Sequence, residues 1–304
     1  GDYHEIHVEV SREDTTVRTR GGYTDHAPKD RVRRLIAAGL ALPGTVTDLP
    51  VTAQAFSSRR LDGSPNVLLA VAVEGSEIGM MLTPDGERRI SLDLHSIALE
   101  GTQQIDEAHE QLIARSTDEG HFEAVNDKPV TPRLVGYLAY QHEWTLGPAT
   151  YTFNVAVVDN VTGRVGATSV EIEVPPYTDE DEWGISDPLL VTVDDAGRAH
   201  PVVLGRFVPG DNVVALVEVY GGQRPILSGQ VFLETAGPDK GKQGARLFPL
   251  AMRPTVGGVH RGMVPLPAGM PPGRYFVQLV ITDPPIDEHK IVRLPIEVVA
   301  APIR

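Results

Sequence analysis

The stretch GPATYTFNVAVVD at residues 147–159 returns later in the chain as PPGRYFVQLVITD at residues 271–283. In both copies a Pro-containing corner is followed by a Tyr, and Tyr275 lies 124 residues after Tyr151. After the Tyr, both copies alternate apolar residues with other residues for the length of a strand. This repeat decides the fold, because it predicts two units that end in the same element.

Each copy begins with residues that turn the chain sharply. Pro148 fixes its own φ at about −65°, and Gly273 can adopt a positive φ. The tyrosines that follow, Tyr151 and Tyr275, resemble the tyrosine corner of Greek-key sandwiches, in which the hydroxyl group binds backbone across the corner. We therefore predict a structural role for these four residues.

The strand after each corner is predicted to return as a hairpin, because the 124-residue offset also carries Ile-Glu-Val at residues 172–174 onto Ile-Glu-Val at residues 296–298. One face of each leading strand is apolar, with Tyr151, Phe153, Val155 and Val157 in the first copy and Tyr275, Val277, Leu279 and Ile281 in the second. We predict that each hairpin closes an antiparallel β-sandwich of the immunoglobulin or fibronectin type.

Asp159 and Asp283 end the two repeated strands and invite two interpretations. They could form a calcium-binding or catalytic pair, or each could end its strand by accepting hydrogen bonds from its own turn. We predict the second, structural role for both residues.

The composition limits the classes of function. The 304 residues contain 30 Gly, 25 Pro and no Cys, and the formal net charge is −14. High Gly and Pro content fits short strands joined by turns, and the missing Cys excludes disulfides, cysteine metal ligands and a thiol nucleophile. The acidic balance argues against nucleic acid and anionic membranes as partners. We find no apolar run of 18 residues and no signal peptide, and the opening within a strand suggests an excised or processed piece.

Residues 3–10 are predicted to form a strand that could pair with another chain. His4, Ile6, Val8 and Val10 would share one face, and Tyr3, Glu5, His7 and Glu9 the other. A strand without a neighbour is a template for strand addition, and the proposed contact residues are Tyr3, Ile6, Val8 and Val10. His4 and His7 point to opposite faces, so we predict no metal site there.

The domain organisation follows from these elements. Residues 1–43 are predicted to form a β-hairpin and a helix at 30–42, residues 44–176 a first sandwich, and residues 185–304 a second. Residues 177–184 are predicted to be an acidic linker whose four consecutive carboxylates form a solvated hinge, with a divalent-cation site as the alternative. Within the first sandwich, residues 105–115 fit either a helix or a strand.

Several further segments share a pattern with one known family. They are YHEIHVEV at 3–10, VRTRGGY at 17–23, the helix with DLPVTAQAF at 48–56, the two corners, GISDP at 184–188 and FVPGD at 207–211. Together they resemble the bacterial von Willebrand factor A-related family first described in Acidobacteria, in the region C-terminal to the A-type domain. The resemblance implies export, a modular architecture and an interaction role, with residues 3–23 as the exit of an A-type domain. The metal-binding Asp-x-Ser-x-Ser motif of that domain is not in this sequence, so its metal-dependent binding is not implied.

The leading hypothesis for function is a non-enzymatic, exported binding or structural module, at the cell surface, in the periplasm or outside the cell. Its partners would be other protein chains, bound by strand addition or self-assembly. We predict no catalytic residue, no cofactor and no bound metal, because the motifs of serine hydrolases, zinc proteases and dinucleotide-binding enzymes are missing from the sequence.

Two alternatives remain open. A carbohydrate-binding accessory module could use Trp144, Tyr137, Tyr140 or Trp183 as stacking faces. A hydrolase acting on polysaccharide could use a carboxylate pair such as Glu171 and Glu173, although their alternation with apolar residues is typical of a solvent-facing strand. A cleft that holds two carboxylates and an aromatic platform would favour the enzyme.

Overall fold

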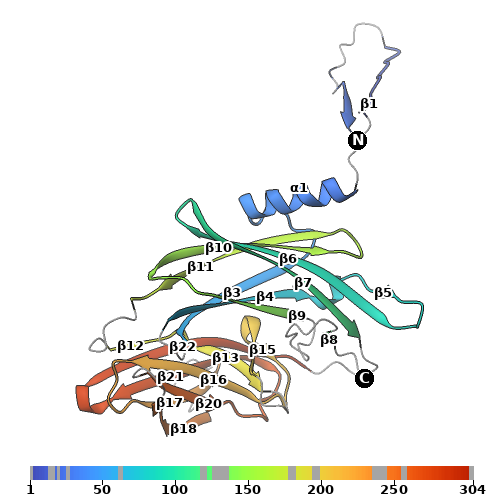
Figure 1. Cartoon of the computed structure of the whole chain (residues 1–304). Coiled ribbons are helices and arrows are strands. Elements are labelled where there is room, and N and C mark those ends of the chain that lie inside the picture. The colour runs from blue at the N-terminus through green and yellow to red at the C-terminus, as the bar shows by residue number, and fades with distance from the viewer. Residues whose placement is uncertain are drawn as a thin grey trace.

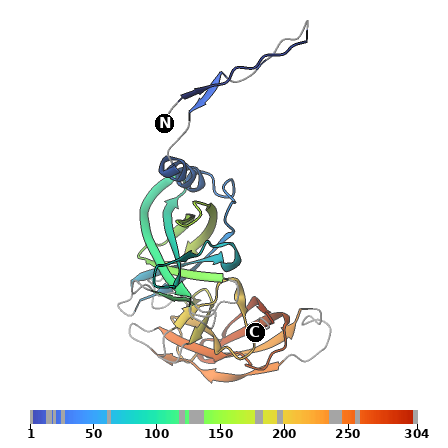
Figure 2. The same cartoon turned by 90° about the vertical axis from the view of Figure 1, so that its right-hand side faces the viewer.

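The fold is described from a computed structural model of the chain, shown in two views in Figures 1 and 2. It describes residues 3–12, 18, 21–24, 28–60, 64–116, 122–124, 137–176, 183–193, 199–234, 245–254 and 259–300. The predicted mainly β fold is confirmed, since antiparallel sheets account for most of these residues. One helix, α1 (Pro28–Ala41), occupies the predicted helical segment with its ends shifted by one or two residues.

The N-terminal sandwich consists of two sheets that enclose one apolar core. The first sheet has the order β3-β4-β9, formed by β3 (Val51–Arg59), β4 (Pro65–Glu74) and β9 (Tyr137–Trp144). The second has the order β11-β10-β6-β7-β8, with β5 also paired to β6. Its strands are β5 (Met81–Leu82), β6 (Arg88–Glu100), β7 (Gln103–Ser116), β8 (Phe122–Ala124), β10 (Ala149–Asp159) and β11 (Val165–Val174). Buried residues of both sheets meet in the core cluster, with Phe153 0% exposed.

The C-terminal sandwich repeats this plan. One sheet has the order β14-β13-β16-β20-β19, with β12 also paired to β16, and the other has the order β15-β22-β21-β17-β18. The first sheet contains β12 (Gly184–Ile185), β13 (Leu189–Val193), β14 (Ala199–Pro201), β16 (Val213–Tyr220), β19 (Arg253–Pro254) and β20 (His260–Pro265). The second contains β15 (Arg206–Phe207), β17 (Ile226–Leu233), β18 (Ala245–Ala251), β21 (Gly273–Asp283) and β22 (Glu288–Val298). Gly184, which we predicted to be in the linker, is therefore part of a strand.

The repeated stretch forms corresponding strands in the two sandwiches. Strand β10 begins and ends 124 residues before β21, and each pairs with the strand that follows it, β11 or β22. The neighbouring strands also correspond in the two sheets, because the order β11-β10-β6-β7 matches the order β22-β21-β17-β18. The sequence repeat therefore marks the same position in two sheets of the same order.

Both repeated tyrosines bond back across their corners. The Tyr151 hydroxyl donates to the carbonyl of Gly147 at 3.0 Å, and the Tyr275 hydroxyl donates to the carbonyl of Pro271 at 2.8 Å. Pro148 follows the first acceptor directly, and Gly273 opens β21 with a positive φ of 157°, a backbone conformation that residues with side chains rarely adopt. Each hydroxyl therefore fixes the chain direction at the point where it enters its strand.

We expect loss of the first corner bond to destabilise the chain more than loss of the second. The Tyr151→Phe variant should lower the free energy of unfolding by about 1 kcal/mol, because the Tyr151 side chain is buried. Tyr275→Phe should have a smaller effect, since its bond is exposed to water, which can replace it. Urea unfolding of the two variants checks this order, and an unchanged Tyr151→Phe variant would contradict it.

The carboxylates that end the repeated strands are fully buried and act as hydrogen-bond acceptors. Asp159 accepts the Val161 N–H at 2.9 Å in its own turn, and also the Gly79 N–H at 2.7 Å from a distant segment. Asp283 accepts the backbone N–H groups of Gln223 at 2.7 Å and Arg224 at 3.0 Å. The prediction of bonding within the turn is thus correct for Asp159 and wrong for Asp283, whose partners lie between β16 and β17.

Helix α1 covers the outer face of the β10–β11 hairpin, as Figure 1 shows. Its apolar residues Val32, Leu35, Ile36 and Leu40 contact a second small cluster that includes Ala156 and Val158. The Asn154 side chain donates to the Leu40 carbonyl at 2.7 Å and so satisfies a backbone acceptor near the helix end. Residues 153–159 of β10 are buried on both faces, and all of them except Asn154 and Asp159 are apolar.

The N-terminal hairpin is shorter than predicted. Strand β1 (Tyr3–Glu5) pairs with β2 (Gly22–Thr24), and the expected continuation of the strand to Val10 is wrong. In Figures 1 and 2 the hairpin stands clear of both sandwiches. Of the predicted contact residues, Tyr3 lies in β1 and pairs with Thr24 of β2. Ile6, Val8 and Val10 follow β1 and are 37%, 45% and 47% exposed.

Residues 105–115 form part of a strand, which resolves the ambiguity of the sequence. Strand β7 pairs with β6 along nearly its whole length, and Leu112 and Ala114 are buried at strand spacing. Residues 122–124 pair with β7 as β8. The acidic run 179–182 and the predicted linker up to residue 182 lie outside the described residues.

A stacked histidine pair joins β6 and β7 and should make stability depend on pH. The His95 and His109 rings stack with centroids 4.2 Å apart. Burial, and then the charge of His109, lower the pKa of His95, while Asp93 acts weakly in the opposite direction. The unfolded chain therefore binds more protons than the folded chain between the folded pKa and about 6.5, the usual value for His.

We expect the thermal midpoint to be highest above this window and to fall as the pH falls from 7.5 towards 5. In the His95→Gln variant, which keeps a polar ring-sized side chain but cannot take up the proton, the fall should be shallower. Melting curves over this pH range check the prediction, and His289→Gln, at an exposed site, is the control. A His95→Gln profile with the same slope as the parent protein would contradict it.

Candidate functional site

The two sandwiches are joined by a buried carboxylate. The side chain of Glu218, on β16, is 2% exposed and accepts the Arg59 N–H at 3.2 Å, the Tyr220 hydroxyl at 2.9 Å and the Arg261 Nε–H at 3.0 Å. A second Arg261 N–H also donates to it. Arg59 is on β3 of the N-terminal sandwich, so donors from both sandwiches satisfy this charge. A buried charge with this many donors holds its neighbours in one geometry.

A second carboxylate continues the same contact. Asp187, between β12 and β13, accepts the Ser57 N–H at 3.1 Å and the Ser57 hydroxyl at 3.0 Å. Ser57 and Arg59 are alternate residues of β3, which is an edge strand of its sheet. The C-terminal sandwich therefore covers the outward N–H groups of this edge with Asp187 and Glu218 in place of another strand.

An apolar contact lies beside the polar one. Val203, in the short 3₁₀ turn η2 (Val203–Gly205), is buried in a cluster with Ala70, Ala72 and Ala139 of the N-terminal sandwich. Leu204 has a φ of 64°, which is uncommon for leucine, and its N–H donates to Gln54 Oε1 at 3.0 Å. Strained backbone persists where its surroundings fix it, so this turn belongs to a defined joint between the sandwiches.

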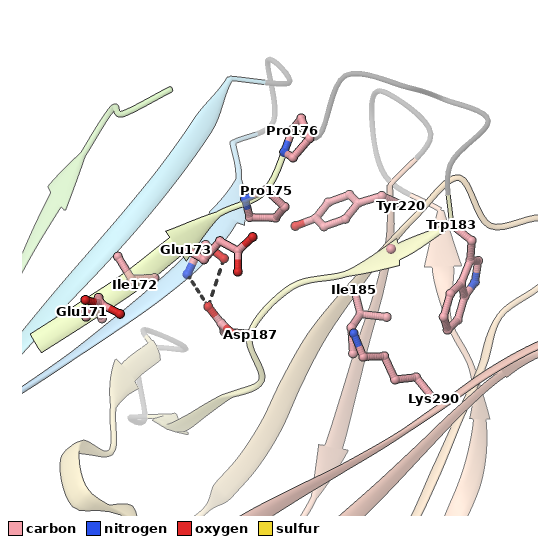
Figure 3. Close-up of a pocket in the computed structure, with 13 residues that line it drawn as sticks. Glu171, Ile172, Glu173, Pro175, Pro176, Trp183, Ile185, Asp187, Tyr220 and Lys290 are labelled. Atoms are coloured by element: carbon pink, nitrogen blue, oxygen red, sulfur yellow. Dashed lines mark hydrogen bonds between the residues drawn. The ribbon is translucent and has the colours of Figure 1, made fainter. Parts of the chain in front are cut away.

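A cleft of about 520 Å³ opens next to the joint, and Figure 3 shows its lining residues. Strand β11 and the segment after it form one wall with Glu171, Ile172, Glu173, Pro175 and Pro176, while Ala55 and Ser57 come from β3. The other wall belongs to the C-terminal sandwich and contains Trp183, Gly184, Ile185, Asp187, Tyr220 and Lys290. The volume is within the range of ligand-binding clefts.

Among the described residues, no strand pairs with the edge of β11 that faces this cleft. At the start of β11 the edge is covered, because Leu49 donates its N–H to Val165 and Ala167 donates its N–H to Val46. These bonds show that odd-numbered residues of β11 direct their backbone groups away from β10. By the same alternation, residues 169, 171 and 173 direct theirs outwards, and no other strand in the described part of the chain pairs with them.

The charge of the cleft is negative. Three carboxylates, Glu171, Glu173 and Asp187, and one ammonium group, Lys290, line it, which gives a formal charge of −2. Glu171 and Glu173 are exposed, while Ile172 between them is buried, as predicted for a solvent-facing strand. Trp183 contributes an indole whose buried Nε1 has no hydrogen-bond partner among the described residues. The cleft thus offers charge, aromatic surface and free backbone groups together.

This arrangement includes the two carboxylates and the aromatic surface that would favour an enzyme, but the placement of Glu171 and Glu173 differs from that of a glycosidase pair. Glu171 and Glu173 stand side by side on one face of one strand, whereas a glycosidase places its carboxyl groups on both sides of the scissile bond. Its general acid is also kept protonated by an apolar surrounding, and both of these side chains are exposed. The geometry fits attraction of a cationic ligand better than proton transfer.

The other candidate aromatic residues are part of the core or the joint. Trp144 and Tyr140 are buried in the N-terminal core, and burial with the nearby charge of Glu110 raises the pKa of Tyr140. The Tyr137 hydroxyl accepts a hydrogen bond from Arg206 across the joint. Of the four residues considered for stacking on sugars, Trp183 alone lines the cleft.

Sequence reasoning missed the residues that hold the joint. Ser57 and Asp187 lie 130 residues apart, and no local pattern connects them. Glu218 did leave a signal, because it is a single charged residue within the apolar run of β16. Among the described residues we find no group of three or more His, Asp or Glu side chains placed to hold a metal ion. The described helices are too short or too polar to cross a membrane.

Comparisons with known proteins add little to this picture. No family model and no curated protein matches the chain. Among solved structures, a protein from Corynebacterium diphtheriae described as membrane anchored is 11% identical, with 83% of this chain and 59% of that chain covered and a TM-score of 0.23. A structure of manganese lipoxygenase of Gaeumannomyces graminis and partial zonadhesin of Komagataella pastoris is 12% identical, with 80% and 93% covered and a TM-score of 0.22. Both likenesses are too weak to carry an argument about this chain.

Proposed function

We propose that the chain is a non-enzymatic binding module that is exported and holds other protein chains at the cell surface, in the periplasm or outside the cell. The observation that carries the proposal is the cleft beside the joint, where a strand edge without a partner among the described residues and a negative charge face the same space. The tandem sandwiches would be of the immunoglobulin or fibronectin type, in agreement with the matching strand orders of the two halves.

The joint supports this role because it keeps the cleft in one shape. The walls of the cleft come from two sandwiches. If their connection were flexible, binding of a partner would have to fix their relative positions, and this entropy cost would lower the affinity. The donors around Glu218 and the apolar contact at Val203 remove this freedom before a partner arrives. A preorganised cleft of this kind suits recognition rather than turnover.

A carbohydrate-binding module is the second candidate, and Trp183 is the residue that favours it. The half-buried Trp183 indole could stack on a sugar ring through the face that lines the cleft, while the carboxylates accept hydrogen bonds from the sugar hydroxyl groups. Against it stands the number of aromatic residues, since the described lining contains Trp183 and Tyr220, and the Tyr220 hydroxyl is already used by Glu218. We rank this function below protein binding.

A photo-crosslinking residue at position 176, at the exposed rim of the cleft, distinguishes the candidates. In cells that make the protein we expect a crosslinked protein partner in the exported fraction, and a matched residue at exposed position 234 should not capture it. A glycan array supplies the opposing test. Glycan binding that Trp183→Ala abolishes, with no crosslinked protein, would overturn the proposal.

A further inference from the structure

We propose that the open edge of β11 binds an extended strand of a different protein, in which Arg or Lys occupies alternate positions beside Glu171 and Glu173. This inference rests on the proposed function and names the partner chemistry of the same cleft. The partner strand would pair with the outward backbone groups of residues 169, 171 and 173.

The edges of strands β3 and β11 differ in how they are covered. Edge strands that face solvent are templates for further strands, and proteins usually block them. On β3 the outward N–H groups of Ser57 and Arg59 are blocked by carboxylates of the C-terminal sandwich. On β11 the equivalent groups beyond Ala167 have no such cover in the described part of the chain. The cleft therefore leaves one edge available and closes the other.

The side chains of β11 define what the added strand must carry. Glu171 and Glu173 lie two residues apart on the exposed face, so the residues beside them on a paired strand also lie two apart. Opposite charges at these positions are favourable and like charges are not. The residue between them would lie beside Ile172, which is buried, and should be apolar. The recognised pattern is basic–apolar–basic in an extended segment.

The overall charge indicates that the strand comes from another protein rather than from a second copy. A formal net charge of −14 makes copies of this chain repel one another. The same charge attracts a basic partner and speeds the encounter. The cleft charge of −2 focuses that attraction at the edge of β11.

The test uses the whole chain and the synthetic peptide acetyl-Thr-Val-Arg-Val-Arg-Val-Thr-amide, followed by calorimetry and by backbone amide resonances. We expect shifts at residues 168–174 and loss of binding when Glu replaces both Arg residues. The Glu171→Lys/Glu173→Lys variant should bind the Arg peptide about tenfold more weakly. Glu100→Lys/Glu234→Lys makes the same change in charge at exposed sites outside the cleft and should bind nearly as well as the parent chain, with only the small loss that a less negative protein causes.

Strand pairing is separated from simple charge attraction by N-methylation of the peptide. Methyl groups on one alternate set of amides should abolish binding, and methyl groups on the other set should leave it intact, because one set faces β11. Equal effects of both sets, binding of the Glu peptide, or a self-associated dimer that occupies the cleft would each overturn the inference. A partner crosslinked through position 176 would then still support the proposed function, so the two failures can be told apart.

Discussion

The Glu218→Ala variant is expected to lose about 3 kcal/mol of unfolding free energy and to loosen the two sandwiches against each other. The substitution leaves the Arg59 N–H, the Tyr220 hydroxyl and the Arg261 guanidinium without their acceptor. Arg261 is 37% exposed, so water recovers part of the loss there. Urea unfolding measures the first effect, and small-angle X-ray scattering measures the second as a broader range of shapes.

Two further variants test whether the loss of stability is specific to the Glu218 carboxylate. Glu218→Gln keeps the shape and one acceptor oxygen, so its loss should lie between those of the parent chain and Glu218→Ala. Glu234→Ala removes an exposed carboxylate and should change stability by less than about 0.5 kcal/mol. If Glu218→Ala unfolds like the parent chain and scatters like it, the carboxylate does not hold the joint. A weaker response to the basic peptide in Glu218→Ala would connect the joint to the cleft.

The Asp159→Ala variant is expected to be the most destabilised single substitution of those considered, by about 4 kcal/mol. It leaves the backbone N–H groups of Gly79 and Val161 and the Thr162 hydroxyl without an acceptor at a site that is 0% exposed. Asp283→Ala should lose less, about 2 kcal/mol, because the two N–H groups that lose their acceptor belong to the exposed residues Gln223 and Arg224, where water can replace part of the bond. Calorimetry measures both differences.

The same variants test the calcium interpretation of the two aspartates. The Asp159 oxygens face hydrogen-bond donors, which occupy the positions that a cation's other ligands would need. We therefore expect the melting temperature of the parent chain to be the same in calcium and in chelator. Asp106→Ala, on the exposed face of β7, is the control for loss of a carboxylate and should change little. A large calcium-dependent shift that Asp159→Ala removes would contradict the structural role.

Sequence reasoning succeeded where the signal was local. The strand after each corner was predictable from Pro148 or Gly273, the Tyr that follows, and apolar alternation, and the hydrogen bonds of Tyr151 and Tyr275 need only a residue four positions earlier. The helix was predictable as well, because its apolar residues recur at helical spacing and Pro43 and Gly44 follow its end.

Prediction from the sequence failed where pairing between distant segments determines the structure. Ile105, Ala108 and Leu112 recur at helical spacing, yet the segment is a strand because it pairs along β6. The hairpin at the N-terminus shows the reverse, since alternation from Tyr3 to Val10 predicts one strand, whereas β1 ends at Glu5 and the described residues 6–10 belong to no strand. The cleft could not be foreseen, because its walls come from segments that only the joint brings together.

The two halves differ in one respect that limits growth by repetition. In the N-terminal sandwich the edge of β3 receives the next unit, whereas the corresponding strand of the C-terminal sandwich, β13, is already covered by β14 of the same chain. The C-terminal sandwich therefore does not offer on β13 the open edge that the N-terminal sandwich offers on β3. A further copy of this joint would first have to displace β14 from β13.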